Sequence, residues 1–401
     1  MTKRRYKNIS KIIIAAIFLA AIFVIIQYNQ TPFGNSFNKT KYIAMIDAGS
    51  SGSRLYVYKI SKPLKNFKNN SIPLISEIKL DSHKIQPGIS SFVNNVDGLE
   101  KYLEPILQEA NKEFKSHKIN PKTQVDFYVL GTAGMRLISK AQQQNIYNKV
   151  YNIISKSNNY NKIITKTLPG EYEGLFDWLA INYHEKNLQL NKPTSATLDM
   201  GGASTQVAFA THNYTDLDNT FTLKFGNAEY TVVSKSFLGL GLNEFRKNFI
   251  NSKNETDNIC MPNPEFDFKT CKNTIKDKLK NKLKNDSPAA YLSFPLESNM
   301  KLVGISGYYY KFKFFTIDKI SEIPKKTNKQ CISSYDDFIK NNLSRDKLTY
   351  LQSHCFDTAY IDTLLDQEYK IPHKYENFSV ADSDVSWTLG AALFFATQNQ
   401  D

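Results

Sequence analysis

The chain has 401 residues and a formal net charge of +13, and 41% of its residues are apolar and 13% aromatic. This composition is typical of a folded protein and excludes wholesale disorder, and the length suffices for two domains of roughly 150–200 residues each. The positive charge comes mostly from lysines dispersed among asparagine, glutamine and tyrosine, and no nucleic-acid-binding sequence motif accompanies it. We therefore expect no nucleic-acid partner.

Residues 1–30 have the pattern of a targeting segment. Several basic residues precede an unbroken apolar run from residue 12 to residue 26. A basic flank predicts that the chain after the run is exported to a periplasm, to a lumen, or to the outside of the cell. The run is shorter than the ~20 residues of a membrane span, and no clear cleavage site follows it. A cleaved signal peptide and a membrane anchor therefore both stay open, with residues 31–40 as a polar linker.

The next part of the chain predicts the elements of a first α/β unit. β-branched and aromatic residues indicate strands over 42–46 and 55–60, joined by a loop of serine and glycine. Apolar residues at helical spacing predict a helix over 97–115. A buried strand is expected over 125–130, and the tight turn at 131–134 should open a helix.

A similar order of elements follows. We expect a helix over 173–183, a second hairpin over 196–210, and a pair of strands broken by glycine and asparagine at 226–227. Another helix should begin in the 240s. Strand–loop–strand units that alternate with helices are typical of α/β lobes.

The last third of the chain is more polar. Lysines between residues 276 and 284 predict an amphipathic helix with a solvated basic face, or else a contact with a polyanion or a membrane surface. A final helix over 381–398 is expected to cross back to the first lobe. The first lobe would then comprise residues 41–168 and 376–401, and the second lobe residues 169–375.

The four cysteines all lie late in the sequence. An even number in an exported protein predicts two disulfides, for which three connectivities exist. We favour Cys260–Cys271 with Cys331–Cys355, because this pairing closes two short loops. No two cysteines have the spacing of a zinc site.

Two short segments repeat one pattern, in which an apolar run ends in aspartate and continues through glycine into small and hydroxyl residues. They are residues 42–54, around Asp47, and residues 196–206, around Asp199. Either aspartate alone could be an ordinary turn residue. A carboxylate is costly to bury unless a cation or water satisfies it, so the matched pair favours Mg²⁺ or Ca²⁺ held through water.

Other residues in these loops suit a phosphate chain. Small residues let backbone N–H groups approach phosphate oxygens, and hydroxyl groups add donors. Arg136 ends a third loop at a helix start, where it is either an anion ligand or a surface residue. Glu173, which lies between glycines at 170 and 174, is either a base that activates water or a first-turn glutamate that the helix dipole favours.

Taken in order, five segments resemble the signature regions of the apyrase family, the nucleoside triphosphate diphosphohydrolases. They are Ile46–Arg54, Gly131–Leu137, Gly170–Gly174 leading to Asn182 and Tyr183, Leu198–Gln206, and Asp384–Gly390. The resemblance covers roughly residues 41–398. It implies two actin-like (RNase H-like) lobes with the active site in the cleft between them. It also implies a hydrolase that removes the γ- and then the β-phosphate of nucleotides outside the cytosol.

The resemblance also implies roles for individual residues. Glu173 corresponds to the general base, and Asp47 and Asp199 would hold the water shell of the metal with Trp387 nearby. The expected phosphate-binding residues are Ser50, Ser51, Gly52, Ser53, Thr132, Ala133, Gly201, Gly202, Ala203, Ser204 and Gln206. Tyr309, Tyr310 and Tyr360 would stack on the nucleobase, or else pack in the core. Gly52-Ser53 departs from the bulkier pair that many members carry, which leaves the choice between tri- and diphosphates open.

Two other functions remain possible on the sequence. One is a related phosphatase of the same superfamily, such as an exopolyphosphatase, and the other is an inert exported nucleotide-binding domain. The Glu173 segment and the intact aspartates favour the apyrase interpretation, with the protein as a monomer.

Overall fold

The computed structural model describes residues 41–61, 72–81, 84–211, 219–250, 259–261, 263–286, 300–341, 345–382 and 385–398. The predicted targeting segment and linker lie outside these residues. Among the helices that are described, none is long and apolar enough to cross a membrane.

The first sheet has five strands in the order β3-β2-β1-β4-β5. β1 and β2 form an antiparallel hairpin in which Asp47 lies opposite Arg54, and β4 and β5 continue the sheet in parallel. The strands are β1 (Lys41–Gly49), β2 (Gly52–Ser61), β3 (Leu74–Glu77), β4 (Val125–Gly131) and β5 (Lys162–Thr167).

The second sheet has six strands in the order β11-β10-β6-β7-β9-β8 and repeats this plan. β6 and β7 form the antiparallel hairpin, with Asp199 opposite Gln206, and β10 and β11 extend the sheet in parallel. The strands are β6 (Ala196–Met200), β7 (Ser204–Ala210), β8 (Thr220–Phe225), β9 (Ala228–Leu238), β10 (Leu302–Ser306) and β11 (Phe378–Val380). The aspartates of the two repeated segments therefore occupy equivalent places in two equivalent sheets.

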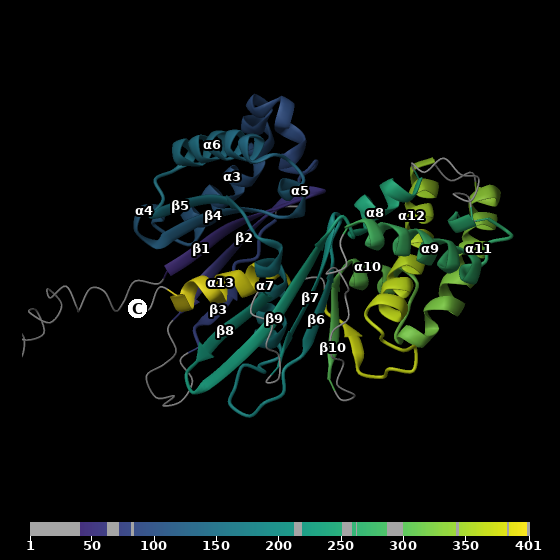
Figure 1. The fold of residues 1–401 in the computed structure, drawn as a ribbon. Helices are drawn as coiled ribbons and strands as arrows, with labels where there is room; N and C mark the ends of the chain where they lie inside the picture. Colours follow the sequence, from purple (N-terminus) through teal and green to yellow (C-terminus); the bar gives the residue numbers. More distant parts are fainter. Residues whose placement is uncertain are drawn as a thin grey trace, which may run out of the picture.

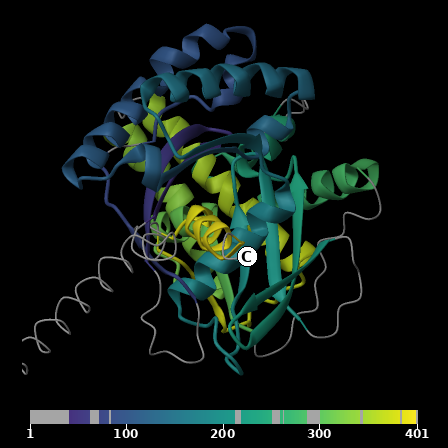
Figure 2. The same ribbon diagram turned by 90° about the vertical axis from the view of Figure 1, so that its left-hand side faces the viewer.

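Helices cover the sheets in three layers (Figure 1, Figure 2). α3 and α6 cover the outer face of the first sheet, α7 and α13 lie between the sheets, and α8 to α12 gather beyond the second sheet. The helices are α3 (Leu99–Ser116), α4 (Pro121–Gln124), α5 (Ala133–Arg136), α6 (Lys140–Ser157), α7 (Gly170–His184), α8 (Leu242–Ile250), α9 (Phe268–Asp286), α10 (Gly307–Phe314), α11 (Ile323–Asn341), α12 (Arg345–Thr363) and α13 (Trp387–Gln398). Short 3₁₀ segments run over Ile89–Asn94, Val96–Gly98 and Ile320–Glu322, and a π-helical turn over Leu364–Glu368 follows α12.

α7 and α13 cross closely in the layer between the sheets. A Cβ placed on Gly390 of α13 would lie 1.9 Å from the carbonyl oxygen of Phe176 in α7, so only glycine fits at the crossing. The Phe176 ring stacks on Trp387 at the start of α13, with the centroids 6.3 Å apart. This aromatic contact fixes the first turn of α13 against α7.

The architecture with two sheets confirms the α/β part of the predicted fold class, whereas the predicted N-terminal segment lies outside the described residues. Several elements differ in detail. The final helix begins at Trp387 rather than at residue 381, because residues 381, 382, 385 and 386 are not helical. The short α5 ends at Arg136, and a new helix, α6, starts at Lys140 behind a capping box on Ser139. Two long helices, α11 and α12, were not expected.

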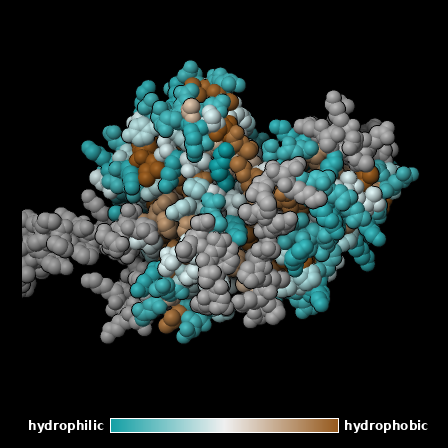
Figure 3. Space-filling model, viewed as in Figure 1, coloured by the Kyte–Doolittle hydropathy of each residue, from teal (hydrophilic) through white to brown (hydrophobic). Residues whose placement is uncertain are grey.

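The polar last third contains the predicted disulfides and the lysine helix. Cys260 is bonded to Cys271, and Cys331 to Cys355, which confirms the expected pairing. The second disulfide joins α11 to α12. In α9, Ile275 and Leu279 are buried, whereas Lys280 is exposed, as an amphipathic helix requires. The face of the molecule in Figure 3 is largely hydrophilic over the described residues.

Candidate active site

A cleft of about 340 Å³ lies between the turns of the two equivalent hairpins. Residues Gly49 to Gly52 of the first turn and Gly201 and Gly202 of the second turn line it. The turns face each other closely, because a Cβ added to Gly202 would lie 2.8 Å from the Ser50 hydroxyl oxygen. The two segments that repeat in the sequence therefore meet at one point.

Asp47 and Asp199 lie near the carboxyl ends of β1 and β6 and line this cleft. The Oδ1 atom of each is buried and has no hydrogen-bond partner among the described residues. Burial raises the pKa of Asp47 to about 7 and the pKa of Asp199 to about 6. The indole of Trp387 donates a hydrogen bond to Asp47, which partly offsets the rise in its pKa.

Two buried carboxylate oxygens without partners suit a hard divalent cation. Such cations take oxygen ligands and commonly keep several waters. Within the described ranges, no group of three or more histidine, cysteine, aspartate and glutamate side chains could hold an ion. The two aspartates fit a cation that they would hold through its water shell, and Trp387 lines the cleft beside them.

Glu173 lies in the first turn of α7 and reaches the same cleft. Its Oε2 atom accepts hydrogen bonds from Arg136 Nη2 and, at 3.2 Å, from Gln206 Nε2. Burial raises the pKa of Glu173 to about 7, although the Arg136 guanidinium lowers it. A carboxylate that titrates near neutral pH is well matched to accept a proton from water.

Two serines complete the network around this pair. Arg136 Nη1 donates to Ser236 Oγ at 3.1 Å, and Arg136 Nη2 donates to Ser204 Oγ at 3.3 Å. Gln206 Nε2 lies 2.7 Å from Ser204 Oγ and 3.1 Å from Ser236 Oγ. The network therefore joins α5 of the first sheet, α7, and strands β7 and β9 of the second.

A further acid, Asp177, lines the cleft one helical turn after Glu173. It is 1% exposed, and its Oδ2 atom has no hydrogen-bond partner in the part of the chain that the structure describes. Burial raises the pKa of Asp177 well above its ordinary value. The sequence analysis missed this residue, although residues four apart share a helix face and Glu173 was already identified.

The expected phosphate-binding residues divide into two groups. Those that line the cleft are Ser50, Ser51, Gly52, Thr132, Gly201 and Gly202. Those that are buried behind it are Ser53, Ala133, Ala203, Ser204 and Gln206. Ser53 points away, since its hydroxyl accepts a hydrogen bond from Tyr102 at 3.0 Å. We therefore do not retain Ser53 as a phosphate ligand.

Of the three candidate nucleobase residues, Tyr309 and Tyr310 line the cleft, and Tyr310 is 52% exposed. Tyr360 does not. It is fully buried, its ring stacks on Phe245 at a centroid distance of 4.1 Å, and its hydroxyl donates to the Leu240 carbonyl at 2.8 Å. A ring enclosed in this way cannot stack on a base, so the expectation for Tyr360 was wrong.

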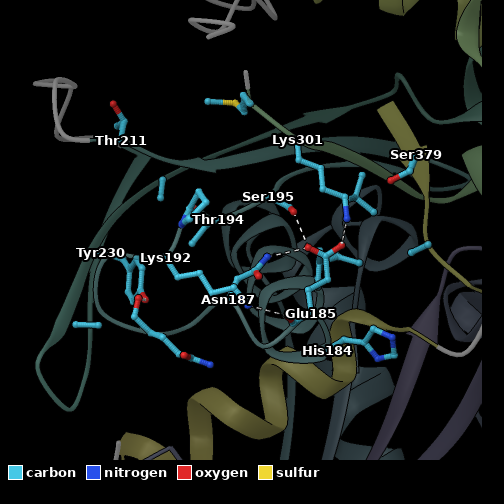
Figure 4. A pocket seen from close by; sticks show the side chains of 18 of the residues that line it. His184, Glu185, Asn187, Lys192, Thr194, Ser195, Thr211, Tyr230, Lys301 and Ser379 are labelled. Carbon is cyan, nitrogen blue, oxygen red and sulfur yellow. Dashed lines mark hydrogen bonds and ion pairs between the residues drawn. The ribbon is translucent and has the colours of Figure 1, made fainter. Parts of the chain in front are cut away.

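A larger cavity, of about 1160 Å³, lies at the opposite end of α7 (Figure 4). Glu185 lines this cavity and accepts hydrogen bonds from Ser195 at 2.6 Å, from Asn187 at 2.8 Å and from Lys301 at 2.6 Å. These contacts satisfy the carboxylate. The paired aspartates, Glu173 and the glycine turns all lie in the smaller cleft, and we place the candidate active site there.

Comparison with known proteins identifies the family of the chain. A model of the GDA1/CD39 (nucleoside phosphatase) family matches residues 35–263 and 248–400. The chain belongs to this family. The family resemblance and the enzyme class predicted from the sequence are thereby confirmed.

Individual relatives are distant in sequence. The chain is 27% identical over 406 residues to the nucleoside-triphosphatase ntp-1 of Caenorhabditis elegans, covering 89% of this chain and 73% of that protein. It is 28% identical over 444 residues to the Golgi apyrase of Schizosaccharomyces pombe, covering 90% of this chain and 76% of that protein.

Solved structures agree in fold. A nucleoside triphosphate hydrolase from Neospora caninum matches with a TM-score of 0.59 at 13% identity, covering 96% of this chain and 98% of that chain. A member of the Ppx/GppA family from Aquifex aeolicus matches with a TM-score of 0.52 at 15% identity, covering 90% of this chain and 99% of that chain. At these identities the likeness concerns the fold alone.

Proposed function

We propose that the protein is an exported apyrase that hydrolyses nucleoside tri- and diphosphates to monophosphates and phosphate. The observation that carries the proposal is the convergence of Glu173, Asp47 and Asp199 with two glycine turns in one cleft. The names of the relatives, a nucleoside-triphosphatase and an apyrase, support the substrate class. The two buried disulfides and the Golgi relative support an exported or lumenal location.

In the proposed reaction, Glu173 accepts a proton from a water molecule that attacks the terminal phosphorus. A bond forms between the water oxygen and phosphorus, and the bond to the bridging oxygen breaks with its electron pair on the leaving nucleotide. Arg136 and Gln206 both bond Glu173 Oε2, so they hold the carboxylate in a fixed orientation. Thr132 and the serines of the first turn would position the phosphate chain.

Asp47 and Asp199 would hold a Mg²⁺ or Ca²⁺ ion through water, with Trp387 orienting Asp47. A bound cation neutralises charge on the phosphate oxygens and thereby stabilises the transition state. The two aspartates would bind the water shell from two sides, because they lie at equivalent positions of equivalent hairpins. Tyr309 and Tyr310 would face the nucleobase.

The test is steady-state phosphate release from ATP, ADP, GTP, GDP and UDP with Mg²⁺ or Ca²⁺. Polyphosphate is the comparison substrate, because a polyphosphatase of the same fold would prefer it. We expect release from nucleotides, and a Glu173→Gln variant that loses about 10²–10⁴-fold in kcat with little change in nucleotide affinity. Activity confined to polyphosphate, or a variant within a few-fold of wild type, would contradict the proposal.

A further inference from the structure

A lysine that the sequence analysis did not identify lies across the first glycine turn. Lys84 lines the cleft, and its Nζ atom donates a hydrogen bond to Ser51 Oγ at 2.6 Å. Its stem runs beside Gly52, since a Cβ added to Gly52 would come within 2.7 Å of Lys84 Cε. Because Gly52 has no side chain, the lysine has room to reach the serine of the turn.

The backbone next to Lys84 is packed on the same turn. Ile85 and Ser53 exchange two backbone hydrogen bonds, of 2.9 and 2.8 Å. A Cβ on Gly88 would lie 2.6 Å from the carbonyl oxygens of both Gly49 and Ser50. The lysine side chain therefore starts from a point that is fixed relative to the turn.

The charges of the cleft make a cation at this place important. Five acids line the cleft: Asp47, Glu173, Asp177, Asp199 and Asp382. Among the described lining residues, Arg54 and Lys84 are the cations that face them. The acids that are ionised repel a phosphate chain that enters the cleft, so a side-chain cation beside the chain favours its binding in addition to the proposed metal ion. Lys84 is bonded to a neutral hydroxyl, which it can exchange for a phosphate oxygen at little cost.

We propose that Lys84 binds the phosphate chain of the nucleotide from the side of the first turn, and that Gly52 keeps its path open. The inference rests on the proposed function, because it takes a nucleoside polyphosphate as the ligand. A hydrogen bond to a charged group is worth enough to change affinity by about 10- to 100-fold when the partner is lost. A contact that stabilises the ground state and the transition state by the same free energy affects only KM. Its removal therefore raises KM and leaves kcat unchanged.

The experiment compares Lys84→Met and Lys84→Arg with Lys79→Met as the matched control. Lys79 is exposed and lies outside the cleft lining, so its replacement makes the same charge change elsewhere. The measurements are kcat and KM for ATP and ADP, and calorimetric binding of inorganic tripolyphosphate. We expect Lys84→Met to raise KM and weaken tripolyphosphate binding by about 10- to 100-fold, with kcat within about threefold. Lys84→Arg should restore most of the affinity.

A second variant tests the role of Gly52. The Cβ of Gly52→Ala would lie 2.4 Å from the Ile85 carbonyl oxygen and 2.7 Å from Lys84 Cε. Both the backbone of the turn and the lysine stem must then shift, so KM should rise although the lysine is still present. Melting temperatures verify folding, and Lys84→Gln replaces Lys84→Met if the latter melts early. KM and tripolyphosphate binding in Lys84→Met that equal those of Lys79→Met would overturn the inference.

Failure of the proposed function has a different signature, namely wild-type protein that releases no phosphate from any nucleotide. The binding measurement still decides the role of Lys84 in that case. Weaker tripolyphosphate binding by Lys84→Met than by Lys79→Met supports it, and equal binding overturns it.

Discussion

Replacing Arg136 by methionine should move the acid limb of the pH–activity profile to higher pH. The Arg136 guanidinium and the Glu173 carboxylate are in contact, and their side chains are only 14% and 9% exposed. Burial raises the pKa of Glu173 and the guanidinium lowers it, and the two effects together give a pKa of about 7. An opposite charge at this range lowers the pKa of a carboxylate by about one to three pH units. Without Arg136, the pKa of Glu173 should therefore rise to between about 8 and 10.

The expected loss follows from the fraction of Glu173 that is deprotonated. With a pKa of about 7, half of the enzyme carries the base at pH 7. A rise of one pH unit leaves about a tenth in that form, and a rise of three units leaves about a thousandth. At pH 7, kcat/KM should thus fall by about 5- to 500-fold, and the loss should shrink as the pH is raised.

The assay is kcat/KM for ATP between about pH 5.5 and 9.5, because this quantity reports the pKa values of the free enzyme. Arg136→Lys keeps the charge and should keep the limb near its wild-type position. Ser236→Ala removes a neutral partner of Arg136 and should not move the limb. An Arg136→Met enzyme that is slowed equally at every pH would refute the electrostatic role of Arg136.

Three further outcomes are expected. Asp47→Asn should raise the melting temperature in EDTA at pH 8 by about 2–5 °C. Burial raises the pKa of Asp47 to about 7, so ionisation of this carboxyl group destabilises the fold as the pH rises from about 4 to 7. A variant that melts below wild type would contradict this account. EDTA should abolish phosphate release and added Mg²⁺ or Ca²⁺ should restore it, whereas full turnover in excess EDTA would remove the cation from the proposal. Mild reduction of the two disulfides should raise KM and leave kcat largely unchanged. The reason is that Cys331–Cys355 stabilises α12, which packs on α10, the helix that carries Tyr309 and Tyr310. Loss of kcat at constant KM would argue against this scheme.

Local patterns in the sequence predicted the two hairpins and much of the cleft. A strand that ends in aspartate and turns through glycine has a local physical cause, and both copies lie where the pattern puts them. Glu173 was found because glycines flank it, and the disulfides because short loops close most easily. Features of this kind depend on residues that are neighbours in the chain.

The parts that the sequence did not predict depend on packing between distant segments. Lys84 reaches the first turn only because the 85–88 stretch folds back on it. Ser236 joins the Glu173 network from β9, which carries no phosphate-loop motif. Tyr360 was misassigned because an aromatic residue that lines a pocket and one that fills a core have the same local pattern, and only the contact with Phe245 distinguishes them.

The two sheets have the same plan, but the helices that follow them carry different side chains, which makes the cleft asymmetric. In each half, the helix after the last parallel strand runs into the layer between the sheets, α7 after β5 and α13 after β11. The first turn of α7 brings Glu173 to Gln206 in the other half, and the first turn of α13 brings Trp387 to Asp47. Two equal halves would treat the two ends of a bound chain alike. One helix carries an acid and the other an indole. If Glu173 activates water as proposed, a linear anhydride lying between the two helices would be attacked at one end only.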